Sequence, residues 1–163
     1  MQLLISDANI LIDLEEGRLI ELMFQLPYQF MIPDILFVEE LEAEHKHLLE
    51  KGLALSELAS ETMIYAMELI PRYTQASRND CFALALAAQE KCTLLTGDRA
   101  LRNAAEAESV MVRGTLWLVE LMVRQGLINI EQAREAFQRM KEAGRRLPWG
   151  IADAILSELE KDV

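Results

Sequence analysis

Short apolar segments alternate with helix-like segments along the whole of this chain. The strands are expected in the short apolar runs at 2–6, 28–32, 63–67, 93–95 and 110–112. Neighbouring parallel strands need long crossovers, usually helical, and sheets built in this way are covered by helices on both faces. The pattern therefore predicts an α/β fold around a parallel sheet.

Helical periodicity and capping residues separate these strands. The helices are expected over 8–16, 18–25, 34–50, 54–59, 77–91, 99–107, 115–125, 130–143 and from Pro148 onward. Residues 63–67 fit either a strand or a helix, and their β-propensity together with the nearby Pro71 favours the strand. The expected organisation is a core over 1–126 with a C-terminal helical extension over 127–163 packed on the same domain. That extension is predicted to pack on the core, although its apolar face also suits a homodimer or partner interface.

Composition limits the class of protein. The chain has 163 residues, 52% of them hydrophobic, which suits one compact domain. No apolar run is long enough for a membrane helix, and the first residues lack the basic segment of a signal peptide. Two cysteines make neither a disulfide framework nor a zinc spacing, so a reduced, cytoplasmic protein is expected. The net charge of −11 means that any polyanionic substrate needs a local basic patch or a screening cation.

Two acidic residues follow predicted strands directly. Asp7 comes after the strand at 2–6, and Asp98 comes shortly after the strand at 93–95. Because ligands bind at the carboxyl ends of strands in such sheets, these two acids are expected to lie close together if their strands are neighbours. Asn9 and Thr96 add an amide and a hydroxyl at the same rim. Each acid also precedes a helix, so an N-cap role is the alternative.

Two further acids lie on the apolar sides of predicted helices. Glu40 is at the edge of the apolar face of 34–50, whereas Glu39 is expected to point into solvent. Asp80 begins an apolar stripe made of Ala83, Leu84 and Ala87. A lone buried carboxylate costs several kcal/mol, although an acid at a helix start is also favoured by the helix dipole. Acids gathered in this way repel one another unless a cation lies between them, so the sequence predicts a divalent-metal site.

Four segments, in order, resemble the motifs of the PIN-domain family. They are Leu4–Ile12 around Asp7, Pro33–Leu41 ending with Glu40 and Leu41, Asp80–Ala85, and Leu94–Arg99 around Asp98. The segments Val112–Leu116 and Arg124–Ile128 resemble a bacterial and archaeal branch of uncharacterised PIN proteins. The resemblance implies a three-layer α/β/α sandwich with about five parallel strands, extra C-terminal helices and Mg²⁺- or Mn²⁺-dependent cleavage of RNA. Many bacterial members are the toxin of a toxin–antitoxin pair of the VapC type, so a protein antitoxin is an expected partner.

The resemblance also suggests roles for the residues. Asp7 and Asp98 are expected to bind one metal directly, Asp80 directly or through water, and Glu40 to act through a water or to place the nucleophile. Arg99 and Arg102 could contact the RNA backbone, or they are ordinary surface arginines. Many members carry a further acid where this chain has Arg102 and Asn103, which leaves open whether one or two metal ions bind.

Two other functions compete with the nuclease. The acidic charge and the missing acid favour a PIN-like binding module without activity. The run Asp7-Ala8-Asn9 also resembles the first motif of aspartyl-nucleophile phosphatases, but Asn9 cannot serve as their general acid. His45 and His47 are two positions apart and would not share a metal on one face of a continuous helix, so His45 is expected at the edge of the core.

Overall fold

The chain folds around a five-stranded parallel sheet in the order β3-β2-β1-β4-β5. The structure is a computed structural model, and it describes residues 1–162. The strands are β1 (Gln2–Ser6), β2 (Tyr28–Pro33), β3 (Ala54–Ser56), β4 (Thr93–Leu95) and β5 (Val112–Arg113). Helices flank this sheet, which confirms the predicted three-layer α/β/α sandwich with five parallel strands.

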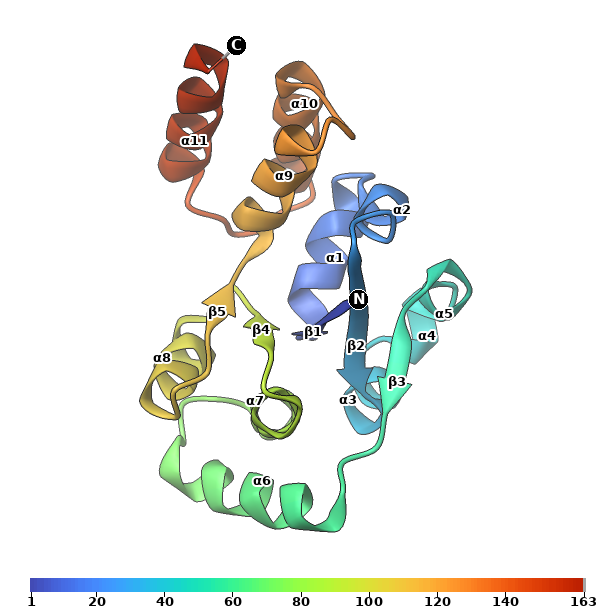
Figure 1. Ribbon diagram of the computed structural model, residues 1–163, viewed down its shortest axis with the longest axis vertical. Coiled ribbons are helices and arrows are strands. Elements are labelled where there is room, and N and C mark those ends of the chain that lie inside the picture. Colours follow the sequence, from blue (N-terminus) through green and yellow to red (C-terminus); the bar gives the residue numbers. More distant parts are fainter. Residues whose placement is uncertain (163) are drawn as a thin grey trace.

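Eleven helices are present in residues 1–162. They are α1 (Ala8–Glu16), α2 (Ile20–Met23), α3 (Asp34–Glu40), α4 (Glu42–His45), α5 (Leu48–Lys51), α6 (Ser60–Arg72), α7 (Arg78–Glu90), α8 (Arg99–Ala107), α9 (Thr115–Arg124), α10 (Ile130–Glu142) and α11 (Trp149–Lys161). Helix α7 contacts β1, β2 and β4, with α6 and α8 beside it. Helix α1 is in contact with α2, α9 and α10. Figure 1 shows α9, α10 and α11 gathered at the end of the molecule opposite α6.

Helix α7 belongs to the core and contacts β1. Seven consecutive residues of α7, Cys81–Ala87, are fully buried, so this helix is covered on every side. Alanine at three of these positions lets the sheet and the flanking helices approach the helix axis closely. Cys81 behaves as a small apolar side chain within this run, as the sequence predicted.

The strand order places the carboxyl end of β1 at a switch point of the sheet. From β1 the chain moves outward to β2 and β3, and it later returns to the other side of β1 for β4 and β5. The crossover helices therefore leave β1 and β4 in opposite directions, which opens a crevice at the ends of these two strands. Asp7 directly follows β1, and Asp98 follows β4.

The expectation of one helix over 34–50 was wrong. The segment forms three short helices, α3, α4 and α5, with the first break at Leu41, where φ is −122°. Leu36, Phe37, Leu41 and Leu48 are buried as predicted. The bent segment therefore still buries these side chains, and it leads the chain into the edge strand β3.

The expectations for 54–67 were also wrong. Residues 54–56 form β3 rather than a helix, and the predicted strand at 63–67 lies inside α6. The buried residues of α6 are Thr62, Ala66 and Leu69, which follow a helical period, whereas Ile64 is 62% exposed. Pro71 lies in the last turn of α6, so the hydrogen bond that its missing N–H removes is near the end of the helix, which stops one residue later.

The C-terminal helices lie close to those of the core. Helix α10 contacts α1 and α9, and α11 contacts α9 and α10. The division at residue 126 stays a prediction, and its last residue, 163, lies outside the described part of the chain. Within residues 1–162, no helix has both the length and the apolar character that a bilayer crossing requires.

Candidate active site

Asp7 is a buried carboxylate held by three contacts at the end of β1. Its side chain is 1% exposed. One carboxylate oxygen accepts a hydrogen bond from the Ile10 backbone N–H at 3.0 Å, which caps α1, and the other accepts one from the Thr96 hydroxyl at 2.5 Å. The Asp7 backbone N–H donates to the Leu95 carbonyl at 3.0 Å. The N-cap role and the placement at the rim of the sheet are therefore both realised.

Thr96 connects Asp7 to Asp98. The register Ser6↔Leu95 brings the residues that follow β1 and β4 side by side. The buried Thr96 hydroxyl donates to Asp7 and accepts from the Asp98 backbone N–H at 3.0 Å. Asp98 in turn caps α8 by accepting from the Ala100 N–H at 3.3 Å. The sequence predicted this neighbourhood, and the hydrogen bonds explain how it is held.

Asp80 links the acids electrostatically. It is partly buried in the first turn of α7, where the Ser77 hydroxyl accepts from its backbone N–H at 3.0 Å. Burial, reinforced by the nearby charges of Asp98 and Glu40, raises the pKa of Asp80 to about 6.

The pKa of Asp7 moves in the same direction. Burial is the main cause, with smaller contributions from Asp80 and Asp13, and it raises this pKa to about 7 despite the hydrogen bonds from Thr96 and Ile10. The charges of Asp98 and Glu40 thus help to raise the pKa of Asp80, and the charge of Asp80 helps to raise the pKa of Asp7. The four acids, Asp7, Glu40, Asp80 and Asp98, form one electrostatic cluster, which we call the acidic cluster.

Glu40 lies at the outer edge of this cluster. It ends α3 and is exposed, and it shares the Asn79 side-chain amide with Glu39: the amide nitrogen donates to Glu39 at 2.8 Å and to Glu40 at 2.9 Å. Glu39 is exposed, as predicted, although it contacts the same amide as Glu40. The Asn79 side-chain oxygen is buried and has no hydrogen-bond partner within residues 1–162.

The chemistry of these donors fits a hard divalent cation. All four side chains offer carboxylate oxygens, which Mg²⁺ and Mn²⁺ prefer. Within residues 1–162, no three of these acids have oxygens that all lie within 4.8 Å of one another. Such spacing suits an ion that keeps several of its waters, as Mg²⁺ does. A cation would also favour the ionised forms of Asp7 and Asp80, whose pKa values burial and the neighbouring acids raise.

A cavity of about 620 Å³ lies beside the acidic cluster. Its lining includes Asn9, Asp98, Arg102, Trp117, Arg145 and Arg146. Arg145 donates to Asp13 at 2.6 Å and to the Asn9 side chain at 3.0 Å. Within residues 1–162, Arg102 and Arg146 form no ion pair closer than 4.0 Å. The cavity is therefore lined by both carboxylates and arginines.

The structure brings two of the four residues predicted to bind substrate, Asn9, Thr96, Arg99 and Arg102, to this cavity. Asn9 and Arg102 line it. Thr96 is outside the lining and donates a hydrogen bond to Asp7, and Arg99 is exposed outside the lining. Asn79, Asp13, Arg145 and Arg146 were missed. Adjacent arginines before Leu147-Pro148 are conspicuous in a chain of net charge −11, and that signal could have identified Arg145 and Arg146.

Comparison with known proteins agrees with this fold. A family model described as a PIN domain matches residues 3–161. A chain in the crystal structure of VapBC2 from Rickettsia felis, bound to a DNA fragment from their promoter, aligns with 69% of this chain and 98% of its own length, with a TM-score of 0.51. At 15% identity, that likeness concerns the fold alone. No curated protein matches the sequence. Since the family model spans nearly all of the chain, the protein belongs to the PIN-domain family.

Proposed function

We propose that this protein is a Mg²⁺- or Mn²⁺-dependent endoribonuclease and the toxin of a toxin–antitoxin pair. The observation that carries the proposal is the acidic cluster at the switch point of the sheet. Asp7 and Asp80 have raised pKa values there because they are buried near other acids. Perturbed carboxyls of this kind, gathered from separate elements beside a cavity, are typical of catalytic sites.

The proposed roles follow from the position of each residue. Asp7 and Asp98 would hold the metal directly, with Asp80 binding it directly or through water. Glu40, exposed at the edge of the cluster, would act through a water or orient the attacking water. The bound ion would polarise the phosphoryl oxygen and lower the pKa of that water. Thr96 would position Asp7 through its hydrogen bond, and the expected products are a 5′-phosphate and a 3′-hydroxyl.

The arginines of the cavity can explain how a protein with a net charge of −11 would bind RNA. Arg102 and Arg146 line the same cavity as Asp98 and have no ion-pair partner in residues 1–162, so their guanidinium groups are available to phosphate oxygens. Trp117 lines the same cavity and offers a ring on which a base can stack. An RNA strand would therefore be held locally, although the molecule as a whole repels it.

A cleavage assay on single-stranded RNA tests the enzymatic part of the proposal. The parent protein is expected to cut RNA in Mn²⁺ or Mg²⁺ and to stop when EDTA is added. Asp7→Asn and Asp80→Asn should each lower the rate at least about a hundredfold, since each removes charge from the acidic cluster. Asp153→Asn, at an exposed position on α11, is the matched control and should cut normally. Cleavage that continues in EDTA would contradict the metal dependence.

The RNA path has a separate test. Arg146→Ala is expected to weaken binding of RNA to the catalytically silent Asp7→Asn protein and to reduce the salt dependence of that binding, because one phosphate contact is lost. Arg134→Ala, on α10 and paired with Glu160, is the control. Equal affinities for the two variants would argue against the cavity as the RNA path.

The toxin role rests on the fold shared with VapBC2, which comes from a toxin–antitoxin pair. Expression of the parent chain in a bacterial host is expected to arrest growth, and expression of Asp7→Asn is not. Co-expression of the adjacent gene should relieve the arrest through a stable complex. Normal growth with abundant folded protein would contradict the toxin role.

One observation favours a second candidate, a PIN-fold binding module without nuclease activity. Where many family members carry a further acid, this chain has Arg102 and Asn103, and Arg102 lines the cavity. A single metal held by Asp7, Asp80 and Asp98 would still supply the chemistry of a nuclease in spite of this change. Absence of cleavage at millimolar Mn²⁺, together with tight binding of a partner, would favour the binding module.

A further inference from the structure

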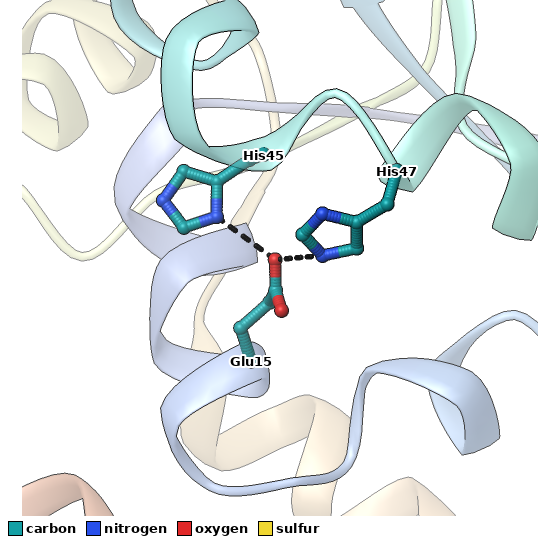
Figure 2. Close-up of side chains that lie close together, drawn as sticks. All are labelled: Glu15, His45 and His47. Atoms are coloured by element: carbon teal, nitrogen blue, oxygen red, sulfur yellow. Dashed lines mark hydrogen bonds and ion pairs between the residues drawn. The ribbon is translucent and has the colours of Figure 1, made fainter.

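A second group of metal-ligating side chains lies away from the acidic cluster. Glu15 in the last turn of α1 faces His45, the last residue of α4, and His47, just before α5. The distances to one Glu15 carboxylate oxygen are 2.8 Å from His45 Nδ1 and 2.7 Å from His47 Nε2. Figure 2 shows both rings turned toward the Glu15 carboxylate from the segment that joins the two helices.

The convergence of the two histidines corrects the expectation from the sequence. On one continuous helix, positions i and i+2 point to different sides. Here α4 ends at His45, and the chain passes through a turn with i→i+3 hydrogen bonds, from Leu49 N–H to the Lys46 carbonyl and from Glu50 N–H to the His47 carbonyl. The rings also use different nitrogens. His45 contacts Glu15 through Nδ1, the nitrogen nearer its own backbone, and His47 through Nε2, the nitrogen further from it.

The donor set differs from that of the acidic cluster. Two imidazole nitrogens and a carboxylate are the ligands of many zinc sites, and imidazole also suits Cu²⁺ and Ni²⁺, whereas Mg²⁺ prefers oxygen alone. Within residues 1–162, this is the only group of three His, Cys, Asp or Glu side chains whose ligand atoms all lie within 4.8 Å of one another.

We propose that Glu15, His45 and His47 bind a transition-metal dication of the Zn²⁺ type. Zinc bonds to nitrogen and oxygen are about 2.0–2.2 Å long, so two donors on one ion lie about 3–4 Å apart. The ligand atoms here all lie within 4.8 Å of one another, so rotation of the side chains would be enough to open their present hydrogen bonds around an ion. His45 and Glu15 are 15% and 20% exposed, and His47 is 45% exposed, so an ion can enter from solvent and keep a water as fourth ligand.

The site is separate from the proposed catalytic centre. Asp7 caps the start of α1, and Glu15 lies eight residues further along this helix, which corresponds to about 12 Å. A bound ion would fasten α1 to the segment that follows Glu40 and leads into β3. The proposal does not depend on nuclease activity, and its tests use no RNA.

Calorimetric titration with Zn²⁺ alone tests the site. The protein should be free of any histidine tag and stripped of metal by a chelator that is then removed. One equivalent of Zn²⁺ is expected to bind and to raise the Tm of the parent protein. His45→Ala and His47→Ala should each lower the affinity at least about tenfold. Glu15→Gln keeps a hydrogen-bond acceptor for the histidines but lacks the anionic ligand, so its fold should be intact while its Zn²⁺ affinity falls.

Crossed controls separate the two sites. Asp7→Asn is expected to keep the parent's Zn²⁺ affinity, and the His45→Ala/His47→Ala double variant should keep any stabilisation by Mn²⁺ that depends on Asp7. Co²⁺ should give the visible absorption of a tetrahedral complex in the parent and in Asp7→Asn, and none in the double variant. Absence of Zn²⁺ binding to the parent, or an affinity unchanged in the histidine variants, would overturn the proposal and leave Glu15 as a hydrogen-bonded brace.

Discussion

At the level of single residues, Asp7 combines a structural role with a chemical one. The end of β1 requires a side chain that caps α1, and a carboxylate does this through the Ile10 N–H. The same position is at the switch point of the sheet, where Asp80 and Thr96 also arrive. Ionising this carboxyl group in the folded protein therefore costs more free energy than ionising an ordinary N-cap aspartate. The difference should appear in the pH dependence of stability.

Asp7→Asn is expected to stabilise the metal-free protein at neutral pH. Because burial raises the pKa of Asp7 to about 7 from 3.8, the folded protein binds more protons than the unfolded chain between these values. Stability contributed by this group is therefore lost as the pH rises from about 4 to 7. Asparagine avoids that loss, so the gain should be on the order of 2–4 kcal/mol at pH 8 and should vanish near pH 4.

Urea denaturation in EDTA at both pH values measures this difference. Asp153→Asn, an exposed change of the same chemistry, should alter the stability little at either pH. A gain for Asp7→Asn of the same size at pH 4 and pH 8 would show that ionisation is not its cause.

Thr96→Val should destabilise the site although valine has nearly the same shape as threonine. The change removes the donor to Asp7, which is buried, and the acceptor for the Asp98 N–H, which is partly buried. A cost of about 1–3 kcal/mol is expected in urea denaturation, because buried polar groups lose their partners. Thr96→Ser keeps the hydroxyl and should retain more of any RNA cleavage than Thr96→Val. Equal activity of the two variants would mean that the hydroxyl has no positioning role.

At the level of the elements, α6 shows where local propensity and tertiary packing disagree. Ile64 and Tyr65 favour a strand, yet Thr62, Ala66 and Leu69 are buried with a helical period against α7. Leu69→Ala is therefore expected to destabilise the protein by about 2–5 kcal/mol in thermal or urea unfolding. Ile64→Ala should be neutral or slightly stabilising, since Ile64 is exposed and alanine is the better helix former. A large loss with Ile64→Ala would indicate that residues 63–67 are not helical.

The elements that the sequence predicted well carry their own boundary signals. Helix α7 begins after the Ser77 cap, and α10 begins with a capping box formed by Asn129 and Gln132. The segment 34–56 has no such signals at its breaks near Leu41 and Lys46, and only Gly52, with φ of 131°, marks the end of a helix there. Its apolar residues fit one helical face, and only the need to pair residues 54–56 with β2 bends the chain there.

At the level of the whole molecule, one contact ties the C-terminal region to the proposed site. Arg145 follows α10, and it donates to Asp13 of α1 and to Asn9 at the rim. The Thr115 hydroxyl donates to the other Asp13 oxygen at 2.8 Å. These bonds hold the cavity wall formed by residues 144–148 against α1.

Arg145→Met should therefore destabilise the protein by about 2–3 kcal/mol, because it leaves the Asp13 carboxylate buried without its cation. Adding Asp13→Asn should recover part of that loss. Arg134→Met removes an exposed partner of Glu160 and should change the stability by less than about 0.5 kcal/mol. A double-mutant cycle by urea denaturation measures the coupling, and independent effects of the two changes would rule out the proposed tie.

The sequence by itself determined the parallel α/β fold, the family, and the positions of Asp7, Asp80 and Asp98 at element ends. These depend on hydrophobic period, capping residues and acids next to apolar segments, all of which are local. Only the tertiary structure decided that Asn79 binds Glu39 and Glu40, that Arg145 meets Asp13, and that His45 and His47 both reach Glu15. These contacts join residues 30 to 132 positions apart, and where such segments meet is set by how the layers pack.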